Sequence, residues 1–219
     1  MNSELAQFLH DKGADIVRFV DISELPAEQT QCFSGAILVC MVLSREFIQD
    51  ARSGNLKADH DEFVEKEHNT DELADWLMLY LRRQGYRAYS QSEDNNTKNG
   101  RYDEKTRSSA LPHKTIARLA GLGFIGKNNL LVTPAYGCAL SMCTVLTDAP
   151  ISPDRYPIIS PMCGTCDVCR NICPTGAIHG NEWSLGCERE FLVDVFKCVC
   201  PLACMLNCPW TLRYVAQKT

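Results

Sequence analysis

The sequence lacks the features of a membrane or secreted protein. No apolar run in its 219 residues approaches the roughly 18–20 that a membrane-spanning helix needs, and the longest, Gly35–Leu43, is typical of a buried strand. The N-terminal MNSELAQFLHDKG has neither the basic start nor the apolar core of a signal peptide. We therefore expect a cytoplasmic protein without membrane contact, in a compartment where thiols stay reduced.

The chain also lacks an overall positive charge. Its formal net charge is −5, from 22 Lys and Arg against 27 Asp and Glu, which argues against non-specific binding of nucleic acid. Only the segment 82–127 is basic, with 10 basic and 4 acidic side chains. Such a segment is more often a solvated face than a binding surface for phosphate or an acidic partner.

What the chain has in excess is cysteine, with 13 residues. A chain of this length buries enough apolar surface to fold without disulfide bonds, and an odd number does not fit a framework made of disulfides alone. Cytoplasmic cysteines usually bind metal or carry out redox chemistry. Nine of the 13 lie between Cys163 and Cys208, so the chemistry is expected there.

Four of these nine form the run C-x2-C-x2-C-x3-C-P. Bacterial ferredoxins carry this run, in which three cysteines bind one 4Fe–4S cluster and the fourth binds a second cluster. Zinc is the alternative, but structural zinc sites usually draw their ligands from two separated pairs. The run therefore predicts two 4Fe–4S clusters. Its cysteines are Cys163, Cys166, Cys169 and Cys173.

The second half of the ligand set has to come from the C-terminal tail. The tail contains five cysteines, Cys187, Cys198, Cys200, Cys204 and Cys208. Cys204–Pro209 repeats the C-x3-C-P ending. By the crossover of the ferredoxin run, we expect Cys208 to complete the first cluster and Cys204 to join Cys173 in the second. Spacing leaves the last two ligands open; we predict Cys187 and Cys200, with Cys198 as the alternative.

Upstream of the cysteines, helices alternate with strands, which predicts an α/β sheet layer. Apolar patterns predict strands at Asp15–Val20, Ala36–Leu43, Tyr86–Gln91, Leu130–Thr133 and Leu140–Thr147. They predict helices from Ser3 as N-cap to Gly13, within His60–Gln84 with Asp71–Arg83 as the clear part, and at Pro112–Ala120. The turn-rich EDNNTKNG at 93–100 predicts an exposed loop.

Three prolines between residues 151 and 161 mark a change in composition, which is typical of a boundary between two modules. We therefore predict an α/β (α+β) N-terminal domain over residues 1–150. A C-terminal ferredoxin-like module with two 4Fe–4S clusters is predicted over residues 155–219.

The glycine stretch GLGFIGK, residues 121–127, imitates two nucleotide-binding motifs. A dinucleotide fingerprint follows a strand and opens a helix, whereas here a helix precedes and a strand follows. A P-loop needs Ser or Thr after its lysine, and this chain has Asn128. Its glycines still allow a backbone to approach a ligand or another segment closely. We predict an acceptor site at 121–128, with Gly123, Gly126 and Lys127 as binding residues and His113 and Lys114 as candidate polar groups.

The remaining thiols have weaker interpretations. Cys40 lies in an apolar strand and is expected in the core. Cys138 and Cys143 bracket a strand start, where a third metal site is the less favoured interpretation.

Three segments together resemble the epoxyqueuosine reductase family: IARLAGLGFIGKNNLL (116–131), TPAYGCALSMCTVLTDAP (133–150) and CGTCDVCRNICPTGAI (163–178). The closing Cys208-Pro209-Trp210 is similar to the ending of that family, so the resemblance covers roughly residues 110–210. It implies a cobalamin-binding domain that receives electrons from two 4Fe–4S clusters. It also implies that the glycine stretch belongs to the cofactor domain and that Cys187 is a cluster ligand.

The chain departs from that family in three respects. The aspartate of a D-x-x-P element is missing, because Pro112 follows Ser109-Ala-Leu. The longer N-terminal domain and the tRNA-binding repeats are absent, and Cys200-x3-Cys204 replaces C-x2-C. These departures predict a short relative with a truncated cofactor domain. They argue against tRNA as substrate and rank cobalamin below the absence of a tightly bound organic cofactor.

The function predicted on these grounds is redox. We expect an oxidoreductase that passes electrons through two 4Fe–4S clusters to a small-molecule or protein acceptor near residues 121–128. The alternative is an electron carrier or binding protein with no substrate of its own. A bound organic cofactor would distinguish the two, because it favours the enzyme.

Overall fold

The computed structural model describes residues 2–54 and 61–217, which form two compact units. Unit 1 contains Met1–Val42, Glu62–Ala120 and Ser141–Tyr156; unit 2 contains Leu43–Asp61, Gly121–Leu140 and Pro157–Thr219. The glycine stretch and the cysteine-rich tail therefore fall in the same unit. The division into residues 1–150 and 155–219 stays a prediction.

Unit 1 is built on a four-stranded sheet with the order β1-β2-β8-β3. Its strands are β1 (Ile16–Asp21), β2 (Gly35–Val42), β3 (Ala88–Ser90) and β8 (Leu140–Thr147). β1 pairs with β2 and β3 pairs with β8, both antiparallel. β2 is apolar throughout because it lies inside the sheet, where its residues from Gly35 to Met41 are buried. The predicted mixed α/β fold is confirmed.

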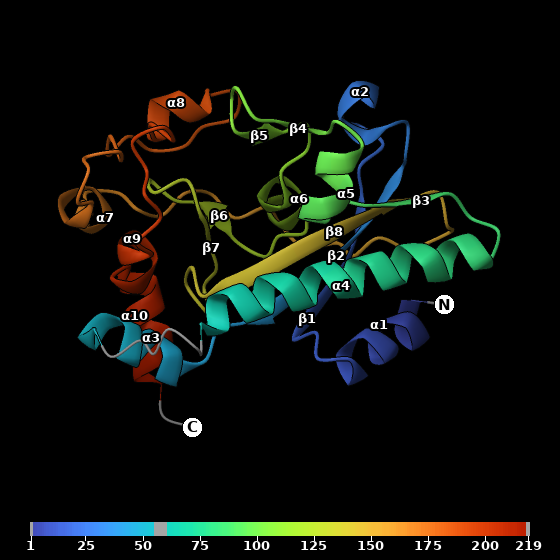
Figure 1. Cartoon of the computed structure of the whole chain (residues 1–219), viewed down its shortest axis with the longest axis horizontal. Helices are drawn as coiled ribbons and strands as arrows, with labels where there is room; N and C mark the ends of the chain where they lie inside the picture. The colour runs from blue at the N-terminus through green and yellow to red at the C-terminus, as the bar shows by residue number, and fades with distance from the viewer. Residues whose placement is uncertain (1, 55–60, 218–219) are drawn as a thin grey trace. The chain divides into compact units, whose positions relative to one another are not determined.

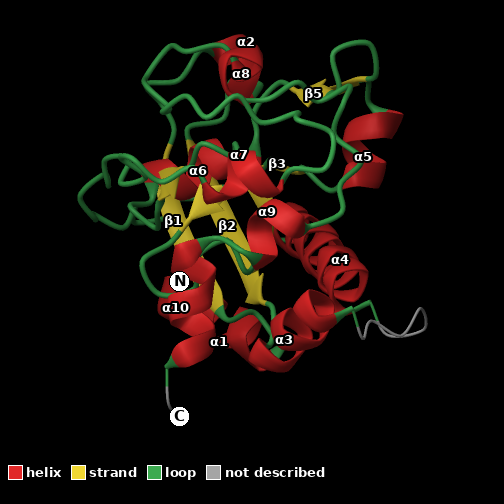
Figure 2. Cartoon of the chain, turned by 90° about the vertical axis from the view of Figure 1, so that its left-hand side faces the viewer, coloured by secondary structure: helices red, strands yellow, loops and turns green. Residues whose placement is uncertain are grey.

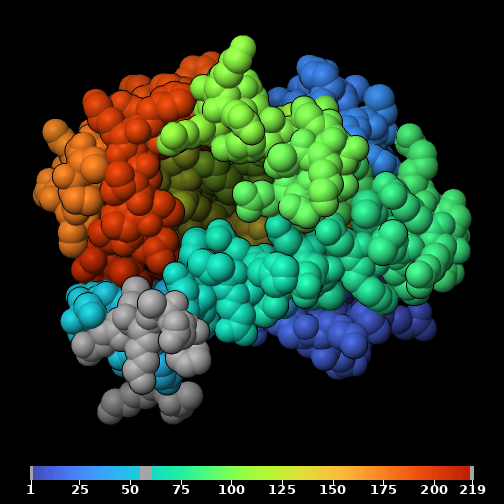
Figure 3. Space-filling model, in the orientation of Figure 1, coloured from blue at the N-terminus to red at the C-terminus, as the bar shows by residue number. Residues whose placement is uncertain are grey.

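Helices pack on this sheet and bury its apolar side chains (Figure 1). Helices α1 (Asn2–Asp11) and α4 (Glu62–Arg83) join β1, β2 and β8 in one core, where Leu9 and Leu77 are fully buried. Helix α6 (His113–Leu119) contacts β1 and β2. The outer side of α4 stays on the surface (Figure 3), where Leu79 is 48% exposed. None of the helices in residues 2–54 and 61–217 is long and apolar enough to cross a bilayer.

Unit 2 consists of short elements joined by loops. Its hairpin pairs β6 (Phe124–Ile125) with β7 (Leu131–Val132). Helices α3 (Arg45–Ser53), α9 (Ala203–Leu206) and α10 (Pro209–Ala216) contact one another (Figure 2), and α7 (Val168–Ile172) contacts α9. Helix α8 spans Arg189–Leu192. The cysteine loops are attached to these short helices.

The prediction of a loop at residues 93–100 is wrong for most of the segment, because residues Glu93–Lys98 form helix α5. The other short elements of unit 1 are helix α2 (Ala27–Thr30) and the paired strands β4 (Tyr102–Asp103) and β5 (Ser108–Ser109). Ser92 caps α5, because its Oγ accepts the N–H of Asn95 at 3.4 Å. Asn96 is buried and its Nδ2 donates to Gln91 O at 2.9 Å. The turn-forming residues thus serve as cap and buried hydrogen-bonding groups.

Two other predicted boundaries differ slightly. The first helix begins at Asn2, so Ser3 lies inside it. The strand predicted at Tyr86–Gln91 is reduced to Ala88–Ser90. His60, the start of the predicted range for the long helix, lies outside the described residues, whereas Asp71–Arg83 is confirmed as helix.

Candidate iron–sulfur site

The glycine stretch contains β6 of the β6–β7 hairpin; helix α6 precedes it and strand β7 follows it, as predicted. A Cβ added to Gly123 would overlap the carbonyl oxygen of Val132. A Cβ added to Gly126 would lie 2.8 Å from Val132 Cγ2 and 2.7 Å from Asn128 Oδ1. The close approach that these glycines permit is therefore made by their own hairpin. Their part in binding an acceptor stays a prediction.

Lys127 links the glycine stretch to the cysteine loop. Its side chain is only 7% exposed, and its Nζ lies 3.1 Å from Asp167 Oδ1. Its backbone N–H donates to the sulfur of Cys163. The lysine predicted to bind an acceptor thus pairs with the segment between two predicted cluster ligands.

Cys163, Cys166, Cys169 and Cys208 are gathered in unit 2. Burial raises the pKa of the Cys163 thiol, and negative charge on Cys208 and Cys166 raises it further. Burial likewise raises the pKa of the Cys169 thiol to about 11, with Cys163, Cys208 and Cys166 adding to the effect. These thiols can ionise together only if positive charge is placed among them. Iron ions would supply that charge, so the donor set fits a cluster.

The surroundings of Cys208 favour its thiolate. It stands at the N-cap of α10. The neighbouring Cys138 thiol, followed by the nearby backbone N–H groups of Trp210 and Thr211, lowers the pKa of Cys208 to about 6. Sequence reasoning missed this contact with Cys138, since a lone Gly-Cys pair before a strand carries no ligand signal.

The partners of Cys204 define a second group of thiols. Burial raises the pKa of Cys204 to about 12, and Cys169, Cys198 and Cys173 raise it further. At Cys173, burial raises the thiol pKa but hydrogen bonds from Thr175, Ala177 and Ile178 outweigh it and lower the pKa. The structure therefore brings Cys169, Cys198 and Cys173 each within electrostatic range of Cys204.

The other two predicted tail ligands lie in loops. The N–H of Cys187 donates to Ser184 O at 3.1 Å, and Cys200 has a left-handed backbone with φ 48°. Their inclusion in the second cluster stays a prediction. Within the described residues, no group of three or more His, Cys, Asp or Glu is placed to hold a single metal ion.

The remaining candidate residues, His113, Lys114, Cys138 and Cys143, are not among the eight predicted cluster ligands. His113 Nδ1 is 3.1 Å from Thr144 Oγ1, and burial lowers the pKa of its imidazole to about 4. Lys114 follows it in α6. Burial and then the charge of Asp71 raise the pKa of the Cys143 thiol, whereas the thiol of Cys138 interacts with Cys208. Cys138 and Cys143 therefore have separate partners.

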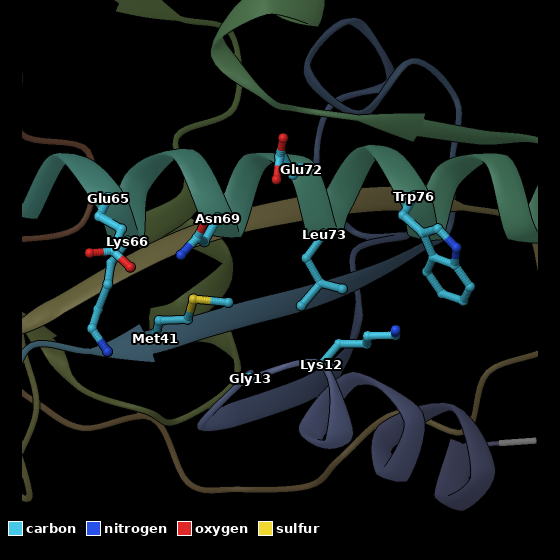
Figure 4. A pocket seen from close by; sticks show the side chains of 9 residues that line it. All are labelled: Lys12, Gly13, Met41, Glu65, Lys66, Asn69, Glu72, Leu73 and Trp76. Carbon is cyan, nitrogen blue, oxygen red and sulfur yellow. The ribbon is translucent and has the colours of Figure 1, made fainter. Parts of the chain in front are cut away.

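A pocket of about 570 Å³ lies in unit 1 (Figure 4). Lys12 at the end of α1, Lys66 and Trp76 of α4 line it, together with carboxylates of α4. Trp76 is stacked between Phe8, with ring centroids 4.2 Å apart, and Tyr80, at 5.2 Å. The indole faces are therefore already covered, and the pocket contains none of the predicted site residues.

Comparison with known proteins relates the chain to one group of reductases. No family model matches the sequence. It is 37% identical over 96 residues to the epoxyqueuosine reductase of Bacillus subtilis (strain 168), covering 40% of this chain and 24% of that protein. It is 42% identical over 70 residues to the reductase of Listeria monocytogenes, covering 32% and 18%. The chain thus matches about a quarter or less of the length of these relatives.

Solved structures share the fold along nearly the whole chain. An epoxyqueuosine reductase with a tRNA-Tyr epoxyqueuosine-modified stem loop has a TM-score of 0.59 and 18% identity, covering 96% of this chain and 65% of that chain. A catabolic reductive dehalogenase has a TM-score of 0.67 and 22% identity, covering 91% and 30%. A further reductive dehalogenase structure, described as suggesting a mechanism for B12-dependent dehalogenation, has a TM-score of 0.64 and 23% identity, covering 91% of this chain and 30% of that chain.

Proposed function

We propose, on the premise that this chain is a short relative of the epoxyqueuosine reductase family, that it is an oxidoreductase with two 4Fe–4S clusters. Electrons would pass through the clusters to an acceptor near residues 121–128. The observation that carries the proposal is the position of Cys208. It comes from the C-terminal tail, yet it lies within electrostatic range of Cys163 and Cys169, which supports the ferredoxin crossover.

Cys163, Cys166, Cys169 and Cys208 would hold the first cluster. Bound there, a 4Fe–4S cluster supplies one-electron transfer at a potential set by its surroundings. The backbone N–H of Lys127 favours the thiolate of Cys163, and the backbone N–H groups of Trp210 and Thr211 favour that of Cys208. Hydrogen bonds to ligand sulfur stabilise negative charge and orient the ligand. The backbone of the glycine stretch and the first turn of α10 would therefore tune this site.

Cys173, Cys204, Cys187 and Cys200 would hold the second cluster, with Cys198 as the alternative to either of the last two. The charge interaction of Cys204 with Cys173 supports this pairing, and its interaction with Cys198 supports the alternative. Together the ligands would form a ferredoxin-like module over residues 155–219, attached to a truncated cofactor-type domain over residues 1–150.

The protein prepared without oxygen is expected to contain about eight irons and eight acid-labile sulfides per chain, since each 4Fe–4S cluster takes four thiolates. Iron, sulfide and zinc analysis, with electron paramagnetic resonance of the reduced protein, measures this. Stoichiometric zinc without sulfide would contradict the proposal. Without clusters, the proposed oxidoreductase would have no groups to carry electrons to the acceptor.

The second candidate function is an electron carrier without a substrate of its own. The contacts of Gly123 and Gly126 with Val132 favour it, because their own hairpin occupies the space beside these glycines. In both cases we propose a redox partner protein or a small-molecule acceptor. One relative has been solved with a tRNA stem loop, but the net charge of −5 argues against tRNA here.

Cobalamin added to the cluster-loaded protein is expected not to be retained. The family's acid is replaced by Ser109, and the glycines Gly123 and Gly126 contact Val132. A large ligand needs a concave pocket that encloses most of its surface. Anaerobic gel filtration with absorption spectra of the protein fractions measures retention, with cobalamin alone as the control. Co-elution of one cobalamin per chain would contradict this expectation and favour a corrinoid-dependent reductase. The fold shared with a dehalogenase structure described as B12-dependent supports that alternative.

A further inference from the structure

Lys127 is a charged side chain buried inside unit 2. Its ammonium forms an ion pair with Asp167, with Nζ and Oδ1 3.1 Å apart. Burying an ammonium is unfavourable unless a partner compensates its charge. Asp167 compensates it only in part, because 41% of the Asp167 side chain is exposed and water screens the carboxylate. The positive charge of the lysine therefore acts mainly on the groups inside unit 2.

The turn at the tip of the β6–β7 hairpin fixes the backbone of Lys127. The N–H of Gly126 donates to Leu130 O at 2.9 Å, and the N–H of Asn129 donates to Gly126 O at 2.8 Å. The side chain of Asn128 closes the same turn, because its Oδ1 accepts the N–H of Leu130 at 3.2 Å. Lys127 lies within this turn, so its side chain extends towards Asp167 from a fixed position.

Asp167 belongs to the loop that carries three of the predicted ligands of the first cluster. It follows Cys166 directly and is the N-cap residue of α7, where its carbonyl accepts the N–H of Asn171 at 2.9 Å. The preceding turn is closed by the N–H of Cys166, which donates to Cys163 O at 3.0 Å. The residue that pairs with Lys127 is thus bonded to a predicted ligand residue, and the ammonium lies beside the ligand loop.

We propose that Lys127 sets the reduction potential of the first cluster: its buried positive charge favours the reduced state, and the carboxylate of Asp167 opposes it. The inference rests on the proposed function. Reduction adds one negative charge to a cluster, and net charge is among the factors that set cluster potentials. A positive charge stabilises this added charge more strongly in the protein interior than in water. Removing the ammonium lowers the potential, whereas removing the carboxylate raises it.

The test is an anaerobic redox titration of the cluster-loaded full chain, followed by electron paramagnetic resonance. Lys127→Met removes the charge but keeps a long side chain, and one of the two clusters is expected to shift to a lower potential. The ratio of reduced to oxidised cluster at a fixed potential should fall about tenfold, which equals about 59 mV for one electron. Lys127→Arg keeps the charge and should stay close to the wild-type potential.

Asp167→Asn separates an effect of charge from a loosened loop. The amide keeps an oxygen that can accept the lysine N–H but removes the negative charge. The same cluster should therefore shift to a higher potential, by a smaller amount because the carboxylate is partly exposed. If the ion pair only held the loop in place, both variants would break the same contact and shift the potential in the same direction.

The exposed ion pair of Lys98 and Asp94 in helix α5 of unit 1 is the matched control. Its Nζ and Oδ2 are 2.8 Å apart, but the two side chains are 71% and 82% exposed. Lys98→Met and Asp94→Asn make the same changes of charge where water screens them. Both variants should leave the two potentials unchanged.

The outcomes separate this inference from the proposed function. Unchanged potentials in Lys127→Met and Asp167→Asn, or shifts of the same sign, would overturn the role of Lys127. Loss of about four irons in both variants would also overturn it, because the ion pair would then hold the loop. If Lys127→Met alone fails to fold, Asp167→Asn decides: a higher potential supports the inference, and no rise overturns it. A wild-type protein without iron–sulfur clusters would instead overturn the proposed function.

Discussion

Replacing Cys204 by serine is expected to remove one cluster and leave the other, so that iron and sulfide each fall from about eight to about four per chain. Cys204 stands in α9, where α7 contacts it, and Cys173 and Cys198 lie within electrostatic range. No other thiol of the short helix can take its place. Because cluster binding is coupled to folding, the unfolding temperature should fall as well. Iron and sulfide analysis of the anaerobic protein measures the loss.

The same measurement decides among the three remaining tail cysteines. Cys187→Ser and Cys200→Ser are each expected to lose about four irons, whereas Cys198→Ser should keep all eight. Cys32→Ser, an exposed thiol of unit 1, is the control without loss. If Cys198→Ser loses iron and Cys200→Ser does not, Cys198 is the ligand, as its charge interaction with Cys204 favours.

Helices and strands were predictable from the sequence where burial alone determines the spacing of apolar residues. β2 is apolar throughout and β8 is mostly apolar, because both lie inside the sheet, so their sequences predict strands. Helix α5 was not predictable in the same way. Its Asn and Asp residues favour turns as strongly as they favour helix ends. The hydrogen bonds of the buried Asn96 side chain with Gln91 O and with the Tyr89 hydroxyl show that the segment packs inwards.

In the candidate site, too, local motifs were predictable from the sequence and contacts between distant segments were not. The run from Cys163 to Cys173 is a local motif, and its crossover to Cys208 follows from the ferredoxin rule. The choice between Cys198 and Cys200 depends on the path of a loop, which spacing does not determine. The hydrogen bond from the Cys138 N–H to Thr211 Oγ1 joins residues far apart in the sequence. It depends on Thr211 and Gly137, whose contact no periodicity predicts.

Gly137→Ala is expected to destabilise the protein by about 4 kcal/mol or more, a loss that single substitutions reach only through a specific structural conflict. Gly137 has φ 59°, so alanine there carries the strain of a left-handed backbone, of order 1–3 kcal/mol. Its Cβ would also overlap the backbone of Thr211, which cannot rotate away as a side chain can. α10 would have to move, and the bond from Cys138 N–H to Thr211 Oγ1 would lengthen.

Gly100→Ala is the matched control for this change. Gly100 has φ 63°, nearly the same backbone, but an added Cβ meets no atom within 4 Å. It should therefore show the backbone strain alone, about 1 kcal/mol. Anaerobic denaturant unfolding of the cluster-loaded proteins compares the two variants. Because Cys208 begins α10, Gly137→Ala should also lose iron from the first cluster while Gly100→Ala retains it. Equal stability and equal iron in the two variants would show that Gly137 does not hold α10 against the Cys138 segment.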